Sequence, residues 1–420
     1  MLISQDEKKL LRDLAKKQHE ISNLPEMHHR KELWYALNNG QLREPLVTFE
    51  FNGPLKEVYP ISSNPNDLVR FAEDQLNFNI TNPVLLDDDR VIPDYLCVPV
   101  RHQFIPFNLP VKKHHPTYSD GSESIGFSVE IPVKDLEEDF HKLRKSVWSI
   151  DRNLQEAKKR REELEEVIGD ILPVKIEFPS FVFDLASSFC TIQGMENMLL
   201  SLYDYPELVH RAMKMLTDDY LEYMGLIESS GAFLANNDGT FLNQGSWGYT
   251  DDLPDDAKGF SDLWGYTCSQ ETVTISPEMF HEFFFPYIKR LSDRLGLLSY
   301  GCCEPVDTLW ENSLVHLKNL RKLSVSPWCN EEDIGAKLRD ARKDNRYIVY
   351  QRKPSPNYVG VDERFDPEGL AAHIARTAKA ASGCPLEITY RDVITAKGEP
   401  WRLKKAIQIT KEQMQKHWSP

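Results

Sequence analysis

The feature that most constrains this chain is a repeated alternation of strand-like and helix-like segments along most of its length. Residues 45–51 are rich in β-branched and aromatic residues and end at Asn52-Gly53, which predicts a buried first strand and a turn. Residues 151–168 are then predicted to form a charged helix and residues 173–183 an extended apolar segment. Later helix and strand pairs are predicted at residues 206–229 and 233–236, 277–295 and 297–300, 306–317 and 323–326, 331–343 and 347–351, and 366–381 and 385–390, before a closing helix at 399–415.

So many alternating units favour a closed (β/α)8 barrel over an open parallel sheet. An open doubly wound sheet would carry a glycine-rich phosphate loop after its first strand, and neither GxGxxG nor GxxxxGK[ST] occurs. Two charged amphipathic segments, residues 5–22 and 29–39, predict a helical extension over residues 1–40 that precedes a barrel over residues 41–420. Residues 90–140 are irregular and rich in proline, which predicts a strand with an elaborated loop region after the first strands.

Composition narrows the partners that this chain can have. With 420 residues, 41% of them hydrophobic, the chain can bury a large core. A formal net charge of −15 repels nucleic acid and anionic membrane surfaces, so neither is expected as a partner. Residues 1–23 are charged throughout and lack the apolar middle of a signal peptide, so we expect a cytoplasmic location. Seven cysteines without small-domain spacing favour thiols or metal ligands over a disulfide framework.

Functional groups of a (β/α)8 barrel lie on the loops that follow the strands, so the residues at the strand ends are the candidates for a site. Gln270 and Glu271, in a polar loop before a helix capped by Ser276, could face the same mouth. The residues that follow predicted strands are Asn236 and Asp238, then Cys302, Cys303 and Glu304, then Trp328 and Cys329, then Arg352 and Lys353, and finally Arg391.

Two thiols and a carboxylate, Cys302, Cys303 and Glu304, are ligands that Zn²⁺ accepts, with Cys329 near enough in barrel order to join them. The alternative is that one cysteine packs inside the barrel while the other lines a pocket without metal. Asp238 could act as a general base, as a metal ligand or as a simple turn residue. Arg352 could hold a substrate carboxylate or form a structural salt bridge.

Several of these motifs resemble those of the uroporphyrinogen decarboxylase superfamily, which also contains cobalamin-dependent methyltransferases. The resemblance covers residues 180–415 and includes Gln270, Ser276-Pro277-Glu278, Phe284-Phe285-Pro286-Tyr287, Tyr300-Gly301-Cys302-Cys303-Glu304 and Trp401-Arg402. It implies a (β/α)8 barrel and a homodimer. The amino-terminal Arg-Gln-Ala-Gly-Arg segment, whose arginines bind tetrapyrrole carboxylates in the decarboxylases, is absent, and Glu50 follows the first strand instead. Haem-pathway decarboxylation is therefore not expected.

The methyltransferase branch typically holds zinc with a His-x-Cys pair at this strand end and a later cysteine. Here Tyr300 or Gly301 takes the place of the histidine, so the resemblance implies a variant site of Cys302, Cys303 and Glu304, completed by Cys329 or Cys384.

The first hypothesis is a methyltransferase that moves a methyl group between a small methylated compound and a corrinoid on a separate protein, with the metal as a Lewis acid. In that scheme Asp238 handles a proton, Arg352 orients the substrate, and Glu304 serves both the metal and catalysis. The substrate-binding candidates are Asn236, Gln270, Glu271, Trp328 and Arg391. The alternatives are a metal-free lyase, or decarboxylase, acting on a small carboxylated molecule, with Asp238, Arg352 and Arg391 at its centre, and a barrel that only binds a ligand or partner.

Overall fold

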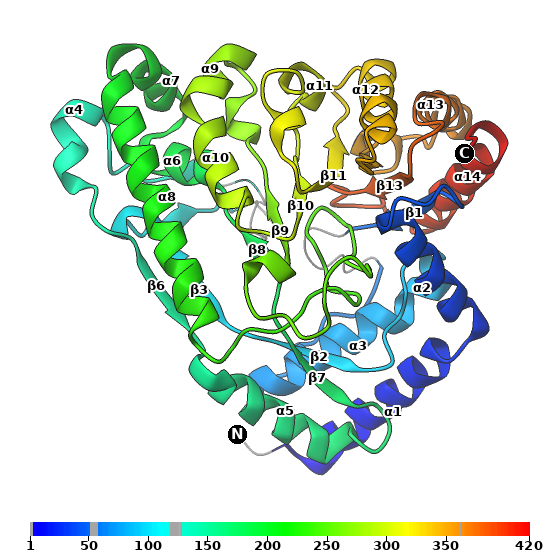
Figure 1. Cartoon of the computed structure of the whole chain (residues 1–420). Helices are drawn as coiled ribbons and strands as arrows, with labels where there is room; N and C mark the ends of the chain where they lie inside the picture. Colours follow the sequence, from blue (N-terminus) through cyan, green and yellow to red (C-terminus); the bar gives the residue numbers. More distant parts are fainter. Residues whose placement is uncertain (1–2, 51–57, 118–125, 127, 361–362) are drawn as a thin grey trace.

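The computed structural model describes residues 3–50, 58–117, 126, 128–360 and 363–420 of the chain. Its main sheet has seven parallel strands in the order β1-β13-β12-β11-β10-β9-β8, with helices packed around it (Figure 1). A separate parallel pair is formed by β2 and β7. These strands are β1 (Leu46–Phe49), β2 (Leu96–Pro99), β7 (Val174–Glu177), β8 (Phe181–Val182), β9 (Trp264–Thr267), β10 (Leu297–Tyr300), β11 (Leu320–Val325), β12 (Val349–Arg352) and β13 (Leu386–Tyr390).

The prediction of a closed barrel is confirmed only in part. β8 follows β7 closely in the chain, so the two sheets are continuous there and together contain eight strand positions in the order expected of a barrel. Within the described residues, however, no ladder joins β1 to β2. Carboxylates cover that edge of β1 instead: the Val47 N–H donates to Asp89 at 2.8 Å and the Phe49 N–H donates to Asp88 at 2.9 Å. The structure therefore shows a large parallel sheet, and the segment that carries Asp88 and Asp89 covers the outer edge of β1.

Most of the predicted helices are present. Ser276 caps α9 as expected, since its hydroxyl accepts the Met279 N–H at 3.2 Å. The helix predicted at 277–295 is divided at Phe284, and the one predicted at 306–317 is much shorter. The α-helices are α1 (Gln5–Ser22), α2 (Pro25–Asn38), α3 (Asp67–Leu85), α4 (Leu136–Asp139), α5 (Gln155–Ile168), α6 (Leu185–Gln193), α7 (Met195–Asp204), α8 (Pro206–Glu228), α9 (Pro277–Phe283), α10 (Phe285–Ser292), α11 (Val306–Leu309), α12 (Glu331–Lys343), α13 (Pro367–Ala380) and α14 (Trp401–His417).

The elaborated region between the second and third strand positions contains two antiparallel strand pairs as well as α4 and α5. β3 (His102–Ile105) pairs with β6 (Val147–Ile150), and β4 (Lys113–His114) pairs with β5 (Ser128–Val129). This agrees with the irregular pattern of the sequence there. No helix in the described ranges has the length and apolar character needed to cross a membrane.

One predicted strand is wrong. Residues 233–236 form no strand, and the corresponding strand of the sheet is β9, about thirty residues later along the chain. The Asn236 side chain accepts the Trp264 N–H at 2.9 Å and donates to the Trp264 carbonyl at 3.0 Å, so it lies at the amino end of β9. Phe233 packs in an aromatic cluster with Phe178 and Phe260. The apolar residues of this segment are therefore explained by packing, and not by a strand.

The chain between α8 and β9 inserts a short turn into the sheet's interior, and we call residues 240–248 the inserted hairpin. Phe241 and Trp247 pair as an antiparallel bridge at its base. At its tip Asn243, Gln244 and Gly245 have φ values of 76°, 55° and 76°. These left-handed values favour glycine, and a Cβ on Gly245 would also lie 2.1 Å from the Thr389 side chain, so the hairpin fits closely against β13.

Polar contacts hold the inserted hairpin between strands that lie far away in sequence. Ser246 donates to Glu387 at 3.0 Å, and Glu387 forms a fully buried ion pair with Lys322 of β11, also at 3.0 Å. The carbonyl of Gly245 accepts the Thr48 hydroxyl at 2.9 Å. The interior of this part of the sheet is thus a hydrogen-bonded network.

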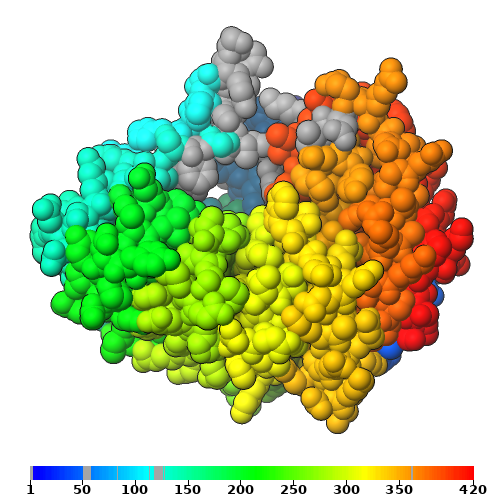
Figure 2. All heavy atoms as spheres, turned by 90° about the horizontal axis from the view of Figure 1, so that it is seen from above, coloured from blue at the N-terminus to red at the C-terminus, as the bar shows by residue number. Residues whose placement is uncertain are grey.

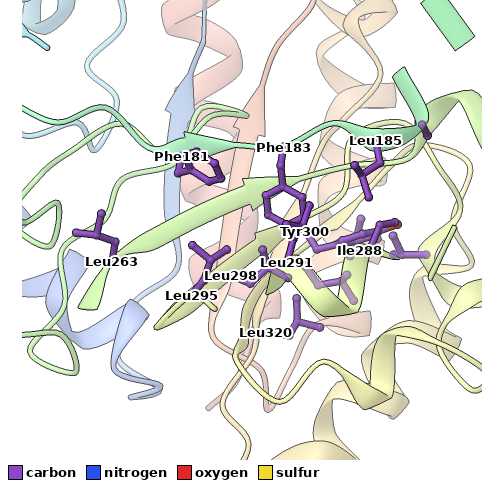
Figure 3. Packing of buried hydrophobic residues seen from close by; sticks show 14 of the residues in the cluster. Phe181, Phe183, Leu185, Leu263, Ile288, Leu291, Leu295, Leu298, Tyr300 and Leu320 are labelled. Carbon is purple, nitrogen blue, oxygen red and sulfur yellow. The ribbon is translucent and has the colours of Figure 1, made fainter. Parts of the chain in front are cut away.

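The apolar core lies mainly between the sheet and its helices. Figure 3 shows Ile288 and Leu291 of α10 beside Leu298 and Tyr300 of β10, and all four side chains are fully buried. Burial of each such aliphatic side chain contributes about 1.5–3 kcal/mol. This packing fixes β10, and therefore the chain that leaves its carboxyl end.

Candidate functional site

Three cysteines meet at the carboxyl ends of β9 and β10, and we call Cys268, Cys302 and Cys303 the sulfur cluster. β9 and β10 are adjacent and parallel, so the residues that follow them emerge side by side. Gly301, with φ of 104°, turns the chain after β10. The sulfur atoms of Cys302 and Cys303 are 3.6 Å apart, and the Cys268 thiol hydrogen-bonds to Cys302. The predicted thiol pair therefore lies at the expected edge, with a third thiol that sequence reasoning missed.

Cys302 differs from Cys268 and Cys303 in the direction of its pKa shift. Hydrogen bonds from the thiols of Cys268 and Cys303, and the positive charges of Lys353 and Arg391, hold its pKa far below the ordinary value although burial acts against this. The thiols of Cys268 and Cys303 have raised pKa values because they donate to Cys302. These shifts favour the thiolate form of Cys302 over the thiolate forms of Cys268 and Cys303.

The two cations reach the thiolate from neighbouring strand ends. Arg391, directly after β13, places Nη1 3.6 Å from the Cys302 sulfur, and Lys353, directly after β12, donates to the Cys302 carbonyl at 3.3 Å. The Gln244 Oε1 atom, at the tip of the inserted hairpin, accepts from both cations. Glu50, after β1, forms an ion pair with Arg391 at 2.9 Å. The predicted Arg391 is thus in the site, but an internal carboxylate and amide already bind it.

Arg352 does not join the site, which corrects its predicted catalytic role. Successive residues of a strand point to opposite faces, so Lys353 turns toward Cys302 while Arg352 turns toward α12. There Arg352 forms an ion pair with Glu331 at 2.7 Å and donates to the Ser326 carbonyl. The structural salt bridge considered for Arg352 is therefore present, with a partner that the sequence had not indicated.

Glu304 has a structural role in this arrangement. Its two carboxylate oxygens accept the N–H of Ser269 at 2.7 Å and the N–H of Cys302 at 2.9 Å, and its side chain is buried. It therefore ties the loop after β9 to the loop after β10. Glu304 is not free to bind zinc as predicted without breaking these bonds.

The zinc ligand set predicted from the sequence does not assemble. In the described part of the chain, no group of three or more histidine, cysteine, aspartate or glutamate residues is arranged to hold a metal ion. Cys329 contacts Ser326 at 3.5 Å and the Glu304 carbonyl at 3.8 Å, whereas Cys384 contacts the Gly335 carbonyl at 3.6 Å. Neither of these cysteines completes the set.

Asp238 and Asn236 lie away from the sulfur cluster, because the strand that was to position them does not exist. Asp238 forms an ion pair with Lys31 of α2 at 2.7 Å and accepts the Tyr35 hydroxyl at 3.0 Å. Asn236 lies at the amino end of β9, as described above, opposite the end that carries Cys268. The proton-transfer role predicted for Asp238 and the substrate role predicted for Asn236 are thus not supported by their positions.

A cavity of about 540 Å³ opens beside Cys303. Its lining brings together three residues predicted to bind substrate, Gln270, Glu271 and Trp328. The remaining lining residues are Met195, Val273 and Pro305. Trp328 is 74% exposed, so it lies at the rim of this cavity. Gln270, Glu271 and Trp328 therefore share one opening, as the sequence predicted for residues at the strand ends.

A second cavity, of about 510 Å³, is lined by Asp184. The Cys268 sulfur is 3.8 Å from the Asp184 carboxylate. Burial, together with the charge of Glu271, raises the pKa of Asp184 to about 7. Asp184 directly follows the extended segment at residues 173–183, so the strand-end rule could have identified it. Figure 2 shows that the face seen from above is hollowed near its centre.

Of the three comparisons with known proteins, the one with solved structures finds matches. No family model matches the sequence, and no curated protein matches it. Among solved structures, a methyltransferase from Methanosarcina mazei is 11% identical with a TM-score of 0.49, over 90% of this chain and 98% of that chain. A native Bacteroidetes-affiliated GH5 cellulase linked with a polysaccharide utilization locus is 12% identical with a TM-score of 0.30, over 63% and 76%. Function therefore has to be argued from the site.

Proposed function

We propose that this chain is a methyltransferase in which the Cys302 thiolate takes a methyl group from a small methylated substrate. The observation that carries the proposal is the Cys302 sulfur, which has a low pKa and lies where parallel strands end, next to a cavity lined by Cys303. A thiolate is the nucleophilic form of cysteine, and covalent catalysis divides one difficult transfer into two easier ones.

In the first transfer, a lone pair of the Cys302 sulfur forms a bond to the methyl carbon. The bond between that carbon and the substrate's heteroatom breaks, and its electron pair goes to the heteroatom. A heteroatom that leaves as an anion needs a proton, and Asp184, with a pKa of about 7, can hold one at neutral pH.

In the second transfer, an acceptor attacks the methyl carbon and the electron pair of the sulfur–carbon bond returns to Cys302. Sulfur leaves more readily when its thiolate is stabilised, and Lys353 and Arg391 provide that stabilisation. The cations that lower the pKa of Cys302 therefore assist both transfers.

We propose as acceptor a corrinoid carried by a separate protein, and a homodimer as the assembly; both come from the sequence resemblance. The corrinoid would supply the nucleophile that removes the methyl group. No step passes through zinc, because the carboxylate of Glu304 is engaged by two backbone N–H groups. Metal content of protein purified without added metal, compared with a Cys302→Ala, Cys303→Ala double variant, tests the zinc expectation directly.

The lyase alternative receives less support from the geometry. A decarboxylase needs cations that face the substrate carboxylate. Lys353 and Arg391 are the cations beside the sulfur cluster, and Gln244 and Glu50 already bind them. The charged residues that line the two adjoining cavities are the carboxylic acids Glu271 and Asp184.

The proposal is tested with methyl donors that carry deuterium. Trideuteromethyl iodide and trideuteromethylated ethers and amines are incubated with the protein, and the label is located by peptide mass spectrometry. We expect the label on Cys302, and its loss when reduced cobalamin is added as acceptor. Cys190 is an internal control, since it is half-buried and burial raises its pKa to about 11. Label on Cys190 but none on Cys302 would overturn the proposal.

A further inference from the structure

The charge of the cavity beside Cys303 indicates what kind of ligand it accepts. Its seven lining residues include a single charged side chain, Glu271, together with Trp328 and the apolar side chains of Met195, Val273 and Pro305. Its volume of about 540 Å³ lies within the range of small-molecule sites. A surface of this kind offers one negative charge within a largely apolar wall.

Glu271 lacks a compensating positive charge. Gln270 donates to its Oε1 atom at 3.4 Å and Ser187 also hydrogen-bonds to the carboxylate. None of the ion pairs found among the described residues includes Glu271. Glu271 is half-buried and burial raises the pKa of its carboxyl group, so a bound cation would stabilise the charged form.

Trp328 adds a second reason to expect a cation. The face of an indole ring attracts positive charge, more strongly than the ring of phenylalanine or tyrosine does. Trp328 follows β11 and is exposed at the cavity rim, where a ligand can reach it. Methyl groups on the ligand would meet the apolar side chains of Met195 and Val273.

We propose that this cavity binds a small organic cation whose methyl groups are attached to a positively charged nitrogen or sulfur. This inference rests on the proposed function and specifies its substrate class. Glu271 would balance the positive charge, Trp328 would contact it from the rim, and Cys303 would place the ligand beside the Cys302 thiolate.

The charge of such a substrate also suits the chemistry. When the Cys302 sulfur attacks a methyl group on a cationic centre, the electron pair of the breaking bond neutralises that centre. The leaving group departs as a neutral amine or thioether and needs no proton. Transfer from these donors should therefore survive Asp184→Asn, whereas transfer from a methyl ether should not.

Binding is measured by calorimetry with choline, with its uncharged isostere 3,3-dimethyl-1-butanol, and with the anion 3,3-dimethylbutanoate. We expect choline to bind about tenfold more tightly than the alcohol, which corresponds to about 1.4 kcal/mol, and the anion to bind most weakly. Glu271→Gln should remove the preference for choline and leave the affinity for the alcohol unchanged. Glu278→Gln is the matched control, because Glu278 is exposed in the first turn of α9 and lies outside the cavity lining.

A second variant distinguishes a loss of binding from a loss of folding. Trp328 is 74% exposed, so Trp328→Leu should leave the fold intact while weakening choline several-fold more than the alcohol. Equal affinity for choline and the alcohol, tighter binding of the anion, or an unchanged preference in Glu271→Gln would overturn the inference.

The same titrations in Cys302→Ser separate this inference from the proposed function. A preference for choline that persists in Cys302→Ser supports the cation site even if no methyl group reaches sulfur. Methyl labelling of Cys302 without a preference for choline supports the methyl transfer and rejects the cation site.

Discussion

The charge of the Cys302 sulfur depends on residues from several strand ends. Cys268 follows β9, Lys353 follows β12 and Arg391 follows β13, and each of them stabilises the thiolate. The sequence predicted Cys302 and Arg391 at this edge, because both directly follow predicted strands. The sequence did not indicate which of Arg352 and Lys353 faces the site, because the face to which each side chain points depends on the register of the strand.

Lys353→Met tests this account of the thiolate. Removing the positive charge should raise the pKa of Cys302, so less thiolate is present at low pH. For each unit by which the new pKa exceeds the pH of the assay, the thiolate fraction falls about tenfold. We expect wild-type Cys302 to react with iodoacetamide at a nearly constant rate between pH 6 and 8, and the pH at which the rate falls to half of its plateau to be higher in the variant than in the wild type. Lys343→Met, at an exposed ion pair with Asp340, is the control.

If Lys353→Met left the pH of half-maximal Cys302 alkylation unchanged, the thiolate would not depend on this cation. Peptide mapping assigns the alkylated cysteine, so the other cysteines do not obscure the result.

At the scale of elements, the inserted hairpin carries an amide group from the loop before β9 into the site. Gln244 is 109 residues from Lys353 and 147 residues from Arg391, yet its side chain binds both cations. Nothing in the local sequence indicates that Gln244 contacts these two residues, because the contact depends on the path of the inserted hairpin. The incorrect strand at 233–236 arose in the same stretch, where a short apolar run resembles a strand without pairing as one.

Gln244→Glu tests whether the hairpin tip positions the cations. A negative charge at this point would compete with Cys302 for Lys353 and Arg391, and should raise the pKa of Cys302. We expect the pH at which alkylation of Cys302 falls to half of its plateau rate to be higher in this variant than in the wild type. Asn243→Asp is the matched control, since it places the same charge at the hairpin tip on a residue whose carbonyl accepts the Ser246 N–H. An equal shift in both variants would indicate a general charge effect.

At the scale of the whole molecule, the sequence predicted the alternating architecture and the edge of the sheet that carries the site. It also predicted both helices of residues 1–40 as an extension that precedes the barrel. The structure shows these helices packed against the rest of the chain: Leu11 and Ala15 of α1 are fully buried in the main core, and Trp34 of α2 is fully buried in a second cluster with Leu46 of β1 and Val349 of β12. The Trp34 indole donates to the Asp89 carbonyl at 2.9 Å, and Asp89 is the residue that covers the edge of β1. Periodicity reveals a helix but not the surface against which it packs.

We therefore expect removal of residues 1–40 to prevent folding of the remaining chain. Loss of a fully buried tryptophan alone costs about 3–5 kcal/mol, which is a large share of the stability of a typical domain. The truncation would also expose the apolar surfaces that Leu11 and Ala15 cover and the carboxylates beside β1. Circular dichroism during heating should show no cooperative transition, whereas a chain lacking only residues 1–3 should unfold near the temperature of the full chain. A cooperative transition in the longer truncation, close to that of the full chain, would mean that the barrel folds without its helical extension.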